Sequence, residues 1–391
     1  MKRLKKEKAI TLVSLVITIV ILLILAGISI STLTNTGIFE KAKEAKKASE
    51  NAEKEQNKLL EQYREQLNKY MPEELTDDKI NKVLSQTENT FLKDTNGNSF
   101  TLPAGFKVVV NDDTNNAKTV DKGIVVEDKD ENEFVWVPVG KIYTDVERTN
   151  EKSKIIELKR CDFYKYECEV NFFNNSIEED RGNITKPLQN LGNIIAKNIT
   201  DFKNSISNNG GYYIGRYEAG VTGYDINNVK TENSNKEVNW TGYVNEKDKQ
   251  LKAVSKINQQ VWNYITQNKA AELSQNMYNS SKFTSDLINS YAWDTAITFI
   301  QECTGKTDYA MQISQNKSLA KTGTSGDNPC NIHDMSGNVV EWSTETSNNL
   351  YSPCIYRGGT YYETIGYAGF RYNDKVFNGG FDYGFRVILY L

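Results

Sequence analysis

The chain is short of the side chains that most catalytic and metal sites use. It has one histidine and five cysteines among 391 residues. The cysteines form no CxxC pair and no spacing typical of zinc ligands. We interpret the single histidine, His333, as a packed or hydrogen-bonded turn residue rather than a base or a ligand. Cysteine pairing stays open, because Cys161 with Cys168 and Cys330 with Cys354 are both candidates for disulfides.

An excess of positive charge is also absent. The net charge is −4 and the isoelectric point is about 5.5. This balance argues against a nucleic-acid partner, because phosphate contacts need a basic surface. The charge is nevertheless uneven, since five basic residues stand within the first eight positions: Lys2, Arg3, Lys5, Lys6 and Lys8.

A long apolar run, ITLVSLVITIVILLILAGISI, follows this basic cluster at residues 10–30. A helix of about 20 apolar residues crosses a hydrocarbon core of roughly 30 Å. The run is longer than the apolar part of an ordinary cleaved signal, and no clear cleavage site follows it. The sequence therefore predicts a transmembrane helix at residues 10–31, with residues 1–8 inside the cell and the later chain outside.

The next segment, residues 32–71, is predicted to form an amphipathic helical stalk. It is rich in Ala, Glu, Lys, Gln and Leu, which favour helix. Its apolar positions from Phe39 to Tyr70 recur at intervals of three, four and seven residues. Pro72 ends the helix, because proline disfavours helical geometry in the residue before it. Residues 72–99 are polar and are predicted to be a linker.

The first seventy residues resemble a type IV prepilin, with a basic leader at residues 1–9, a small residue at Ala9 and the apolar run. The resemblance implies cleavage between Ala9 and Ile10 by a prepilin peptidase. The family usually has glycine where Ala9 stands and glutamate where Ser14 stands. Because that glutamate aligns subunits in a pilus, its absence favours a membrane-retained anchor over a pilus subunit.

From Phe100 the apolar pattern changes to a period of two. The runs FTLPAGFKVVV, KGIVVED, NEFVWVPVG, GGYYIGRYEAGV and GFRVILYL are separated by segments rich in Asn, Asp and Gly, as is typical of antiparallel strands. Residues 257–273 and 285–302 are predicted helices, and residues 304–328 a long loop. The pattern predicts an α+β domain at residues 100–391, with short antiparallel strands and long loops.

Several motifs in this domain resemble the formylglycine-generating-enzyme, or sulfatase-modifying-factor, family, which has a C-type-lectin-like fold. They are FVWVPVG (134–140), GYYIGRYEAGV (211–221), NIHDMSGNVVEW (331–342), YRGGTYY (356–362) and YGFRV (383–387). Enzymes of this family hold copper through two cysteines shortly before the GFR motif. Residues 366–386 contain no cysteine, and one histidine cannot supply the facial triad of iron-dependent relatives. We therefore predict that the chain is not an enzyme.

The same resemblance implies a calcium site in the DMSGNVVEW segment. The implied ligands are two carboxylates and two backbone oxygens, from Asp334, Gly337, Val339 and Glu341. Such oxygen ligands suit a hard cation. An alternative stays open, in which Asp334 caps a turn and Glu341 pairs with Arg357 or Arg386.

In the tail, residues 357–386, aromatic residues alternate with Gly, Asn and Asp, as in antibody paratopes. We predict ligand contacts from Tyr361, Tyr362, Tyr367, Tyr372, Asn373, Asp374, Phe377, Phe381 and Tyr383. We expect Tyr356, Phe370 and Phe385 to lie in the core. The tail also resembles the variable region of diversity-generating-retroelement target proteins, which end in the same RGG and GFR frame. The alternative is that the aromatic residues only fill the core of a loop-rich domain.

Together these features predict a bacterial surface-display protein. A single-pass anchor would hold it in the cell membrane, and its extracellular domain would bind an external protein or glycan. A structural minor pilin or pseudopilin is the first alternative. A formylglycine-generating-type oxidase is the second.

Overall fold

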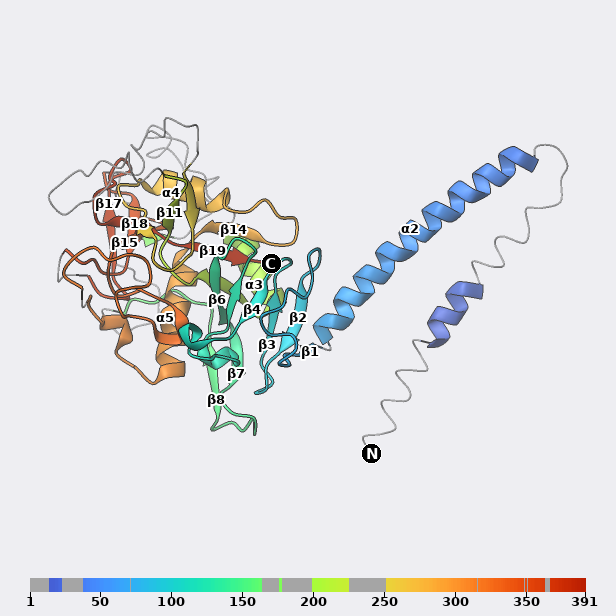
Figure 1. The fold of residues 1–391 in the computed structure, drawn as a ribbon, viewed down its shortest axis with the longest axis horizontal. Helices are drawn as coiled ribbons and strands as arrows, with labels where there is room; N and C mark the ends of the chain where they lie inside the picture. The colour runs from blue at the N-terminus through green and yellow to red at the C-terminus, as the bar shows by residue number, and fades with distance from the viewer. Residues whose placement is uncertain are drawn as a thin grey trace. The chain divides into compact units, whose positions relative to one another are not determined.

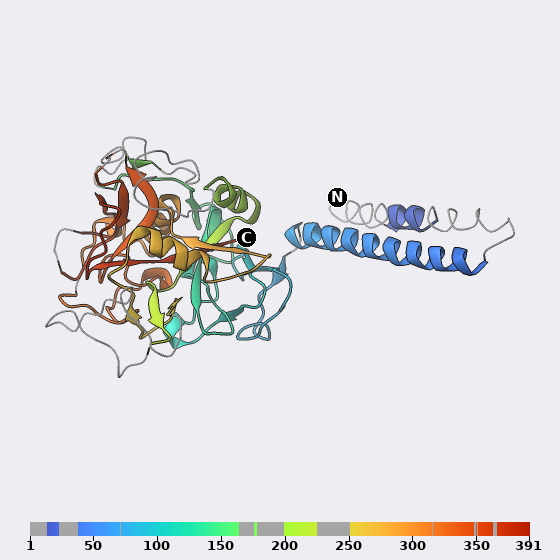
Figure 2. The same cartoon turned by 90° about the horizontal axis from the view of Figure 1, so that it is seen from above.

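The computed structural model describes residues 14–22, 38–70, 72–163, 176–177, 199–224, 251–314, 316–347, 349, 351–362 and 366–391. The chain divides into two compact units, Met1–Leu67 and Asn68–Leu391. Figures 1 and 2 show the ribbon from two directions.

In the first unit, residues 14–22 are helical and α2 spans Ile38–Tyr70. The helix predicted from Phe39 to Tyr70 is confirmed. Among the described residues, no helix is both long and apolar enough to cross a membrane. Most of the predicted span at residues 10–31, including its first residue Ile10, lies outside the described residues, as does Ala9.

The second unit is built around a six-stranded antiparallel sheet. Its strands, in spatial order, are β14 (Thr284–Leu287), β19 (Val387–Tyr390), β10 (Gly211–Gly215), β6 (Glu133–Pro138), β5 (Val125–Glu127) and β4 (Lys107–Val109). Trp136 of β6 lies opposite Tyr213 of β10, which lies opposite Leu389 of β19. The C-terminal GFRVILYL run therefore enters the centre of the fold.

The two central strands, β10 and β6, are buried on both faces. In a sheet with one face in solvent, successive residues would alternate between buried and exposed. All five residues of β10 are buried. Tyr212 donates its hydroxyl hydrogen bond to Ala292 O of α5 (Ser290–Thr304). Tyr213, on the opposite face, donates to Thr101 O of β3 (Ser99–Leu102) at 2.9 Å. Helix α5 thus covers one face and β3 covers the other.

Smaller elements complete the unit. In both views the sheet of β1, β2 and β3 lies on the side opposite the strands of the tail, residues 357–386 (Figures 1 and 2). The strands are β1 (Glu73–Glu74), β2 (Thr90–Lys93), β7 (Gly140–Tyr143), β8 (Ser153–Ile156), β9 (Ser176–Ile177), β11 (Gly220–Thr222), β12 (Lys252–Val254) and β13 (Gln260–Val261). The helices are η1 (Asp112–Thr114), η2 (Val120–Lys122), α3 (Ile199–Asn209), α4 (Gln267–Gln275), η6 (Tyr309–Met311) and η7 (Pro329–Asn331). Part of the segment predicted as a linker, residues 72–99, therefore forms strands: β1 pairs with β2, and β2 pairs with β3.

Both predicted helices of this domain begin later than the apolar spacing indicated. In each case a short strand occupies the predicted start, β13 before α4 and β14 before α5. The side chain of Asn289 accepts a hydrogen bond from Ala292 N at 2.8 Å and caps α5, and Thr266 caps α4 in the same way. A capping residue fixes a helix start more sharply than periodicity does.

Candidate ligand-binding surface

The tail contributes two strands and the last residue of a third strand to a second sheet. Its strands are, in spatial order, β17 (Arg371–Asp374), β16 (Cys354–Arg357), β15 (Val340–Ser347) and β18 (Tyr383–Phe385). Tyr356 lies opposite both Tyr372 and Trp342, while β18 runs parallel to β15. The DMSGNVVEW, RGG and GFR motifs, far apart in sequence, therefore meet in one sheet.

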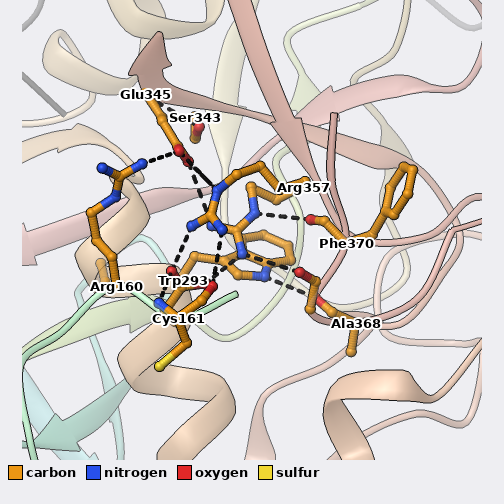
Figure 3. A network of polar contacts seen from close by, with 12 residues as sticks. Arg160, Cys161, Trp293, Ser343, Glu345, Arg357, Ala368 and Phe370 are labelled. Atoms are coloured by element: carbon orange, nitrogen blue, oxygen red, sulfur yellow. Dashed lines mark hydrogen bonds and ion pairs between the residues drawn. The ribbon is translucent and has the colours of Figure 1, made fainter. Parts of the chain in front are cut away.

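A buried network of ion pairs, here called the Asp294 network, ties this sheet to helix α5. Its members are three arginines and two carboxylates: Arg160, Asp294, Glu345, Arg357 and Arg371. Arg371 contacts Asp294 at 2.6 Å and Glu345 at 2.8 Å. Arg357 also pairs with Asp294, and Figure 3 shows Arg160, Glu345 and Arg357 turned toward one another beside Trp293.

Backbone groups of the tail join the same network. Arg357 Nε donates to Phe370 O at 2.9 Å, and Trp293 Nε1 donates to Ala368 O at 2.9 Å (Figure 3). Asp294 and Glu345 are completely buried, as is Arg357. Because buried charges must be paired and hydrogen-bonded to be tolerated, these contacts fix the path of the tail between β16 and β17.

A second cluster, the Arg386 network, holds the other end of the tail. Arg386 contacts Glu341 at 2.6 Å and donates to Gly215 O at 2.9 Å and His333 O at 2.7 Å. Arg386 and Glu341 are completely buried. The alternative in which Glu341 pairs with an arginine is therefore confirmed. The arginine of the GFR motif also joins β18 to the central sheet.

The RGG motif needs its glycines for two different reasons. Gly358 has φ +80°, a left-handed conformation that L side chains rarely adopt. A Cβ on Gly359 would stand 2.4 Å from Ser336 O, closer than real Cβ contacts. The motif therefore lets the tail pass directly against the turn that follows Asp334.

The predicted ligand-contact residues separate into exposed and buried groups. Phe377 is 70% exposed, Tyr362 is 62% exposed and Tyr372 is 43% exposed. Tyr367, Asp374, Phe381 and Tyr383 are half-buried. Tyr361 and Asn373 are buried, since Tyr361 packs beside Phe381 and Asn373 donates to Ser352 O at 2.8 Å.

Aromatic rings connect the exposed positions to the core. The buried ring of Trp342 lies 4.9 Å from Tyr383, which lies 5.3 Å from Tyr356. Tyr372 follows at 6.0 Å from Tyr356 and stacks on Phe370 with an interplanar angle of 3°. Of the three residues expected in the core, Phe385 is buried, whereas Tyr356 and Phe370 are half-buried because their rings lie on this path. The rings present a preorganised aromatic face.

Two buried carboxyl oxygens at the turn with the implied calcium ligands have no hydrogen-bond partner among the described residues, one on the turn itself and one on the segment that precedes β11. These are Asp334 Oδ1 and Glu218 Oε1. Burial raises the pKa of Asp334 to about 7, and burial and the charge of Asp334 raise that of Glu218. Orphan carboxyl oxygens of this kind fit a hard cation. Glu341 is already paired with Arg386.

Metal-binding groups of three or more His, Cys, Asp or Glu side chains are absent from the described part of the chain. Gly337 and Val339 lie in the turn that precedes β15, and both are buried. A cation beside Asp334 would therefore depend on two carboxyl groups and on backbone oxygens.

His333 lies beside this turn and gives a testable pH dependence. Its ring packs on Tyr217 at 4.8 Å, and neither ring nitrogen has a hydrogen-bond partner among the described residues. Burial, with Arg216 and Arg386 nearby, lowers the pKa of His333 from 6.5 to about 3. This residue therefore stabilises the fold above pH 6.5, and its contribution falls by about 1.4 kcal/mol per pH unit below that.

We accordingly expect His333→Phe to reduce the loss of stability between pH 6.5 and pH 5 by up to about 2 kcal/mol. At pH 8 the variant should match the parent protein within about 1 kcal/mol, because the ring stays packed on Tyr217. Urea unfolding at both pH values measures the effect. Equal acid sensitivity of the two proteins would contradict the assignment.

The fold and the motif positions define a C-type-lectin-like α+β domain. Residues 125–391 match the sulfatase-modifying factor enzyme 1-like domain family, and the chain belongs to this family. No curated protein matches the chain.

Two solved structures show distant similarity. One is CarF, at 13% identity and a TM-score of 0.30, covering 46% of this chain and 87% of CarF. The other is Treponema denticola variable protein 1, at 16% identity and a TM-score of 0.22, covering 32% of this chain and 55% of that protein. Both are too distant to carry an argument about function.

Sequence reasoning missed the residues that hold the tail in place. Asp294 stands inside the apolar stripe of α5, and Glu345 and Arg371 stand on strands. The available signal was a single charged residue, Asp294, within SYAWDTAITFI. That segment has no charged face on which Asp294 could be exposed to solvent. A charge at a core position predicts a buried partner of opposite charge.

Proposed function

We propose that the chain is a non-catalytic surface protein whose tail, residues 357–386, binds an external ligand and is diversified at its exposed positions. The observation that carries this proposal is that the tail combines a buried frame with exposed aromatic side chains. Buried arginines fix its backbone, while Tyr362, Tyr372 and Phe377 project into solvent. Rigid aromatic side chains on a fixed frame bind at low entropic cost.

The residues of the tail also argue for binding rather than oxidation chemistry. The segment before the GFR motif has no cysteine, so the thiolates that hold copper in the enzymes of this family have no counterpart there. The anchor at residues 10–31 would place the domain outside the cell, where an exposed aromatic face meets external protein or glycan.

The binding role predicts the behaviour of a triple variant, Tyr362→Ser, Tyr372→Ser and Phe377→Ser. We expect its affinity for any ligand of the parent protein to fall at least tenfold, because aromatic anchors carry most interface energy. A printed glycan array and a panel of purified extracellular proteins serve as probes. Ile155→Ser is the matched control, since Ile155 of β8 is 65% exposed but lies outside the tail. Binding that survives the triple variant would contradict the proposal.

We further propose a calcium site beside Asp334, supported by the orphan oxygens of Asp334 and Glu218. A bound ion would neutralise these two carboxyl groups and fix the turn under the tail. Calcium chloride should raise the melting temperature by several degrees relative to EDTA, because a ligand of the native state stabilises it. Asp334→Asn should lose this rise, and Asp77→Asn, at an exposed carboxylate, should keep it. Equal melting temperatures in calcium and EDTA would exclude the site.

A further inference from the structure

Two cysteines that the sequence did not pair lie on neighbouring elements of the second unit. Cys303 stands in the last turn of α5, and Cys330 is the middle residue of η7. The two elements pack against each other, and both side chains pack on the hydrophobic core. Both are free thiols. The candidate bridge from Cys330 to Cys354 is also not formed, and Cys168, the candidate partner of Cys161, lies outside the described residues.

The two thiols also have charged neighbours in common. Burial and the Cys330 thiol raise the pKa of Cys303, and burial raises that of Cys330 to about 12. Asp121 and Lys122 of η2 influence both thiols, while Lys154 faces Cys303 and Lys306 faces Cys330. The thiols therefore stand where α5, η2 and η7 pack together.

The backbone at Cys330 is unusual for this residue type. Its φ is +50°, a left-handed conformation that Gly and Asn adopt far more readily. The following residue, Asn331, holds the turn in place by donating to Thr114 O at 3.0 Å and Gly123 O at 2.8 Å. A cysteine that is fixed at a strained position, on an element packed against a helix that carries a second cysteine, points to a role for the thiol.

The segment between the two cysteines covers the turn beneath the tail. Gly323 N donates to Asp334 Oδ2 at 3.2 Å, and Ala320 N donates to Asn338 Oδ1 at 2.8 Å. Residues of the same segment line a hollow of about 210 Å³ next to Gly337. Joining Cys303 to Cys330 would close this segment into a loop.

We propose that Cys303 and Cys330 form a disulfide that staples this loop over the Asp334 turn. One thiolate attacks the disulfide of an oxidant such as oxidised glutathione, forming a mixed disulfide and releasing one glutathione thiolate. The second cysteine thiolate then attacks the mixed disulfide, forming the Cys303–Cys330 bond and releasing the second glutathione. The two cysteines lose two protons and two electrons, and oxidised glutathione becomes two molecules of reduced glutathione.

The experiment uses the full chain in detergent, folded in reducing buffer and then incubated with oxidised glutathione at pH 8.5. Remaining thiols are alkylated, and peptides are mapped by mass spectrometry without reduction. We expect a peptide that joins Cys303 to Cys330 and is two hydrogens lighter than the separate peptides. The melting temperature should rise by several degrees and return after dithiothreitol. The reaction should be faster at pH 9.5 than at pH 8.5, because raised thiol pKa values limit the thiolate fraction.

Cys303→Ser and Cys330→Ser should each abolish the joined peptide and the thermal shift. Peptide mapping on the unsubstituted chain decides the matter even if a serine variant folds poorly. Alkylation or glutathione capping of both cysteines after oxidation would overturn the proposal. A bridge from either cysteine to Cys354 or Cys168 would overturn it as well.

Discussion

Replacing Asp294 with alanine is expected to destabilise the second unit by about 3–5 kcal/mol. Asp294 accepts hydrogen bonds from Arg357 and Arg371 and from Cys161 N. Its removal leaves the buried guanidinium groups of Arg357 and Arg371 to share the carboxylate of Glu345. Since these arginines hold β16 and β17, the tail should also become the first site of proteolytic cleavage.

The matched control for this prediction is Glu302→Ala, also on α5. Glu302 pairs with Lys154 at 3.3 Å, with both side chains 40% or more exposed. Exposed pairs contribute at most about 1 kcal/mol, so this change should be nearly neutral. Urea unfolding of the three proteins measures both values. A loss below about 1 kcal/mol for Asp294→Ala would show that the Asp294 network does not hold the tail.

Replacing Arg386 with methionine is expected to cost a similar amount, about 3–5 kcal/mol at pH 7. The change leaves Glu341 as a buried, unpaired carboxylate and removes the donors to Gly215 O and His333 O. Burial already raises the pKa of Glu341, and Arg386 opposes that rise. Without the arginine, Glu341 should take up a proton more readily.

The sign of the pH effect follows from that pKa. A carboxyl group with a raised folded-state pKa destabilises the fold as pH rises through that value. The stability difference between Arg386→Met and the parent protein should therefore shrink from pH 7 to pH 5. The double variant Arg386→Met, Glu341→Leu should recover part of the loss, because no buried charge then remains unpaired. A difference independent of pH would contradict this account of Glu341.

Much of the fold was predictable because residues that are buried in helices and strands recur at regular intervals in the sequence. The strands from Phe100 to Gly140 and the terminal GFRVILYL run were predicted from apolar and β-branched residues. Helix α2 was predicted from its composition and from Pro72. The starts of α4 and α5 were misplaced, because a short strand that runs into a helix gives the same apolar spacing as one longer helix.

The candidate site was predictable in outline but not in detail. The order of the motifs indicated the family, and the pairing of Glu341 with an arginine was the alternative to its predicted role as a calcium ligand. Asp294 and Glu345 were not predicted, because ion pairing between residues that are distant in sequence leaves no local pattern. Tyr361 and Asn373 were predicted to contact ligand and are buried instead. Alternation along a strand predicts that every second residue is exposed, but not which of the two sets it is. In β16 and β17 the buried arginines determine which side chains face the core.

The most direct test of the account is the sequence of the 3′ end of the gene in many cells of one lineage and in sibling strains. A diversified binding surface predicts substitutions that cluster at the exposed positions Tyr362, Tyr372 and Phe377. Codons for the buried Arg357, Arg371 and Arg386 should stay unchanged, because each carries an ion pair that the fold needs. Codons for the exposed aromatic residues that are as uniform as those of the buried arginines would contradict the claim that this tail is a diversified surface.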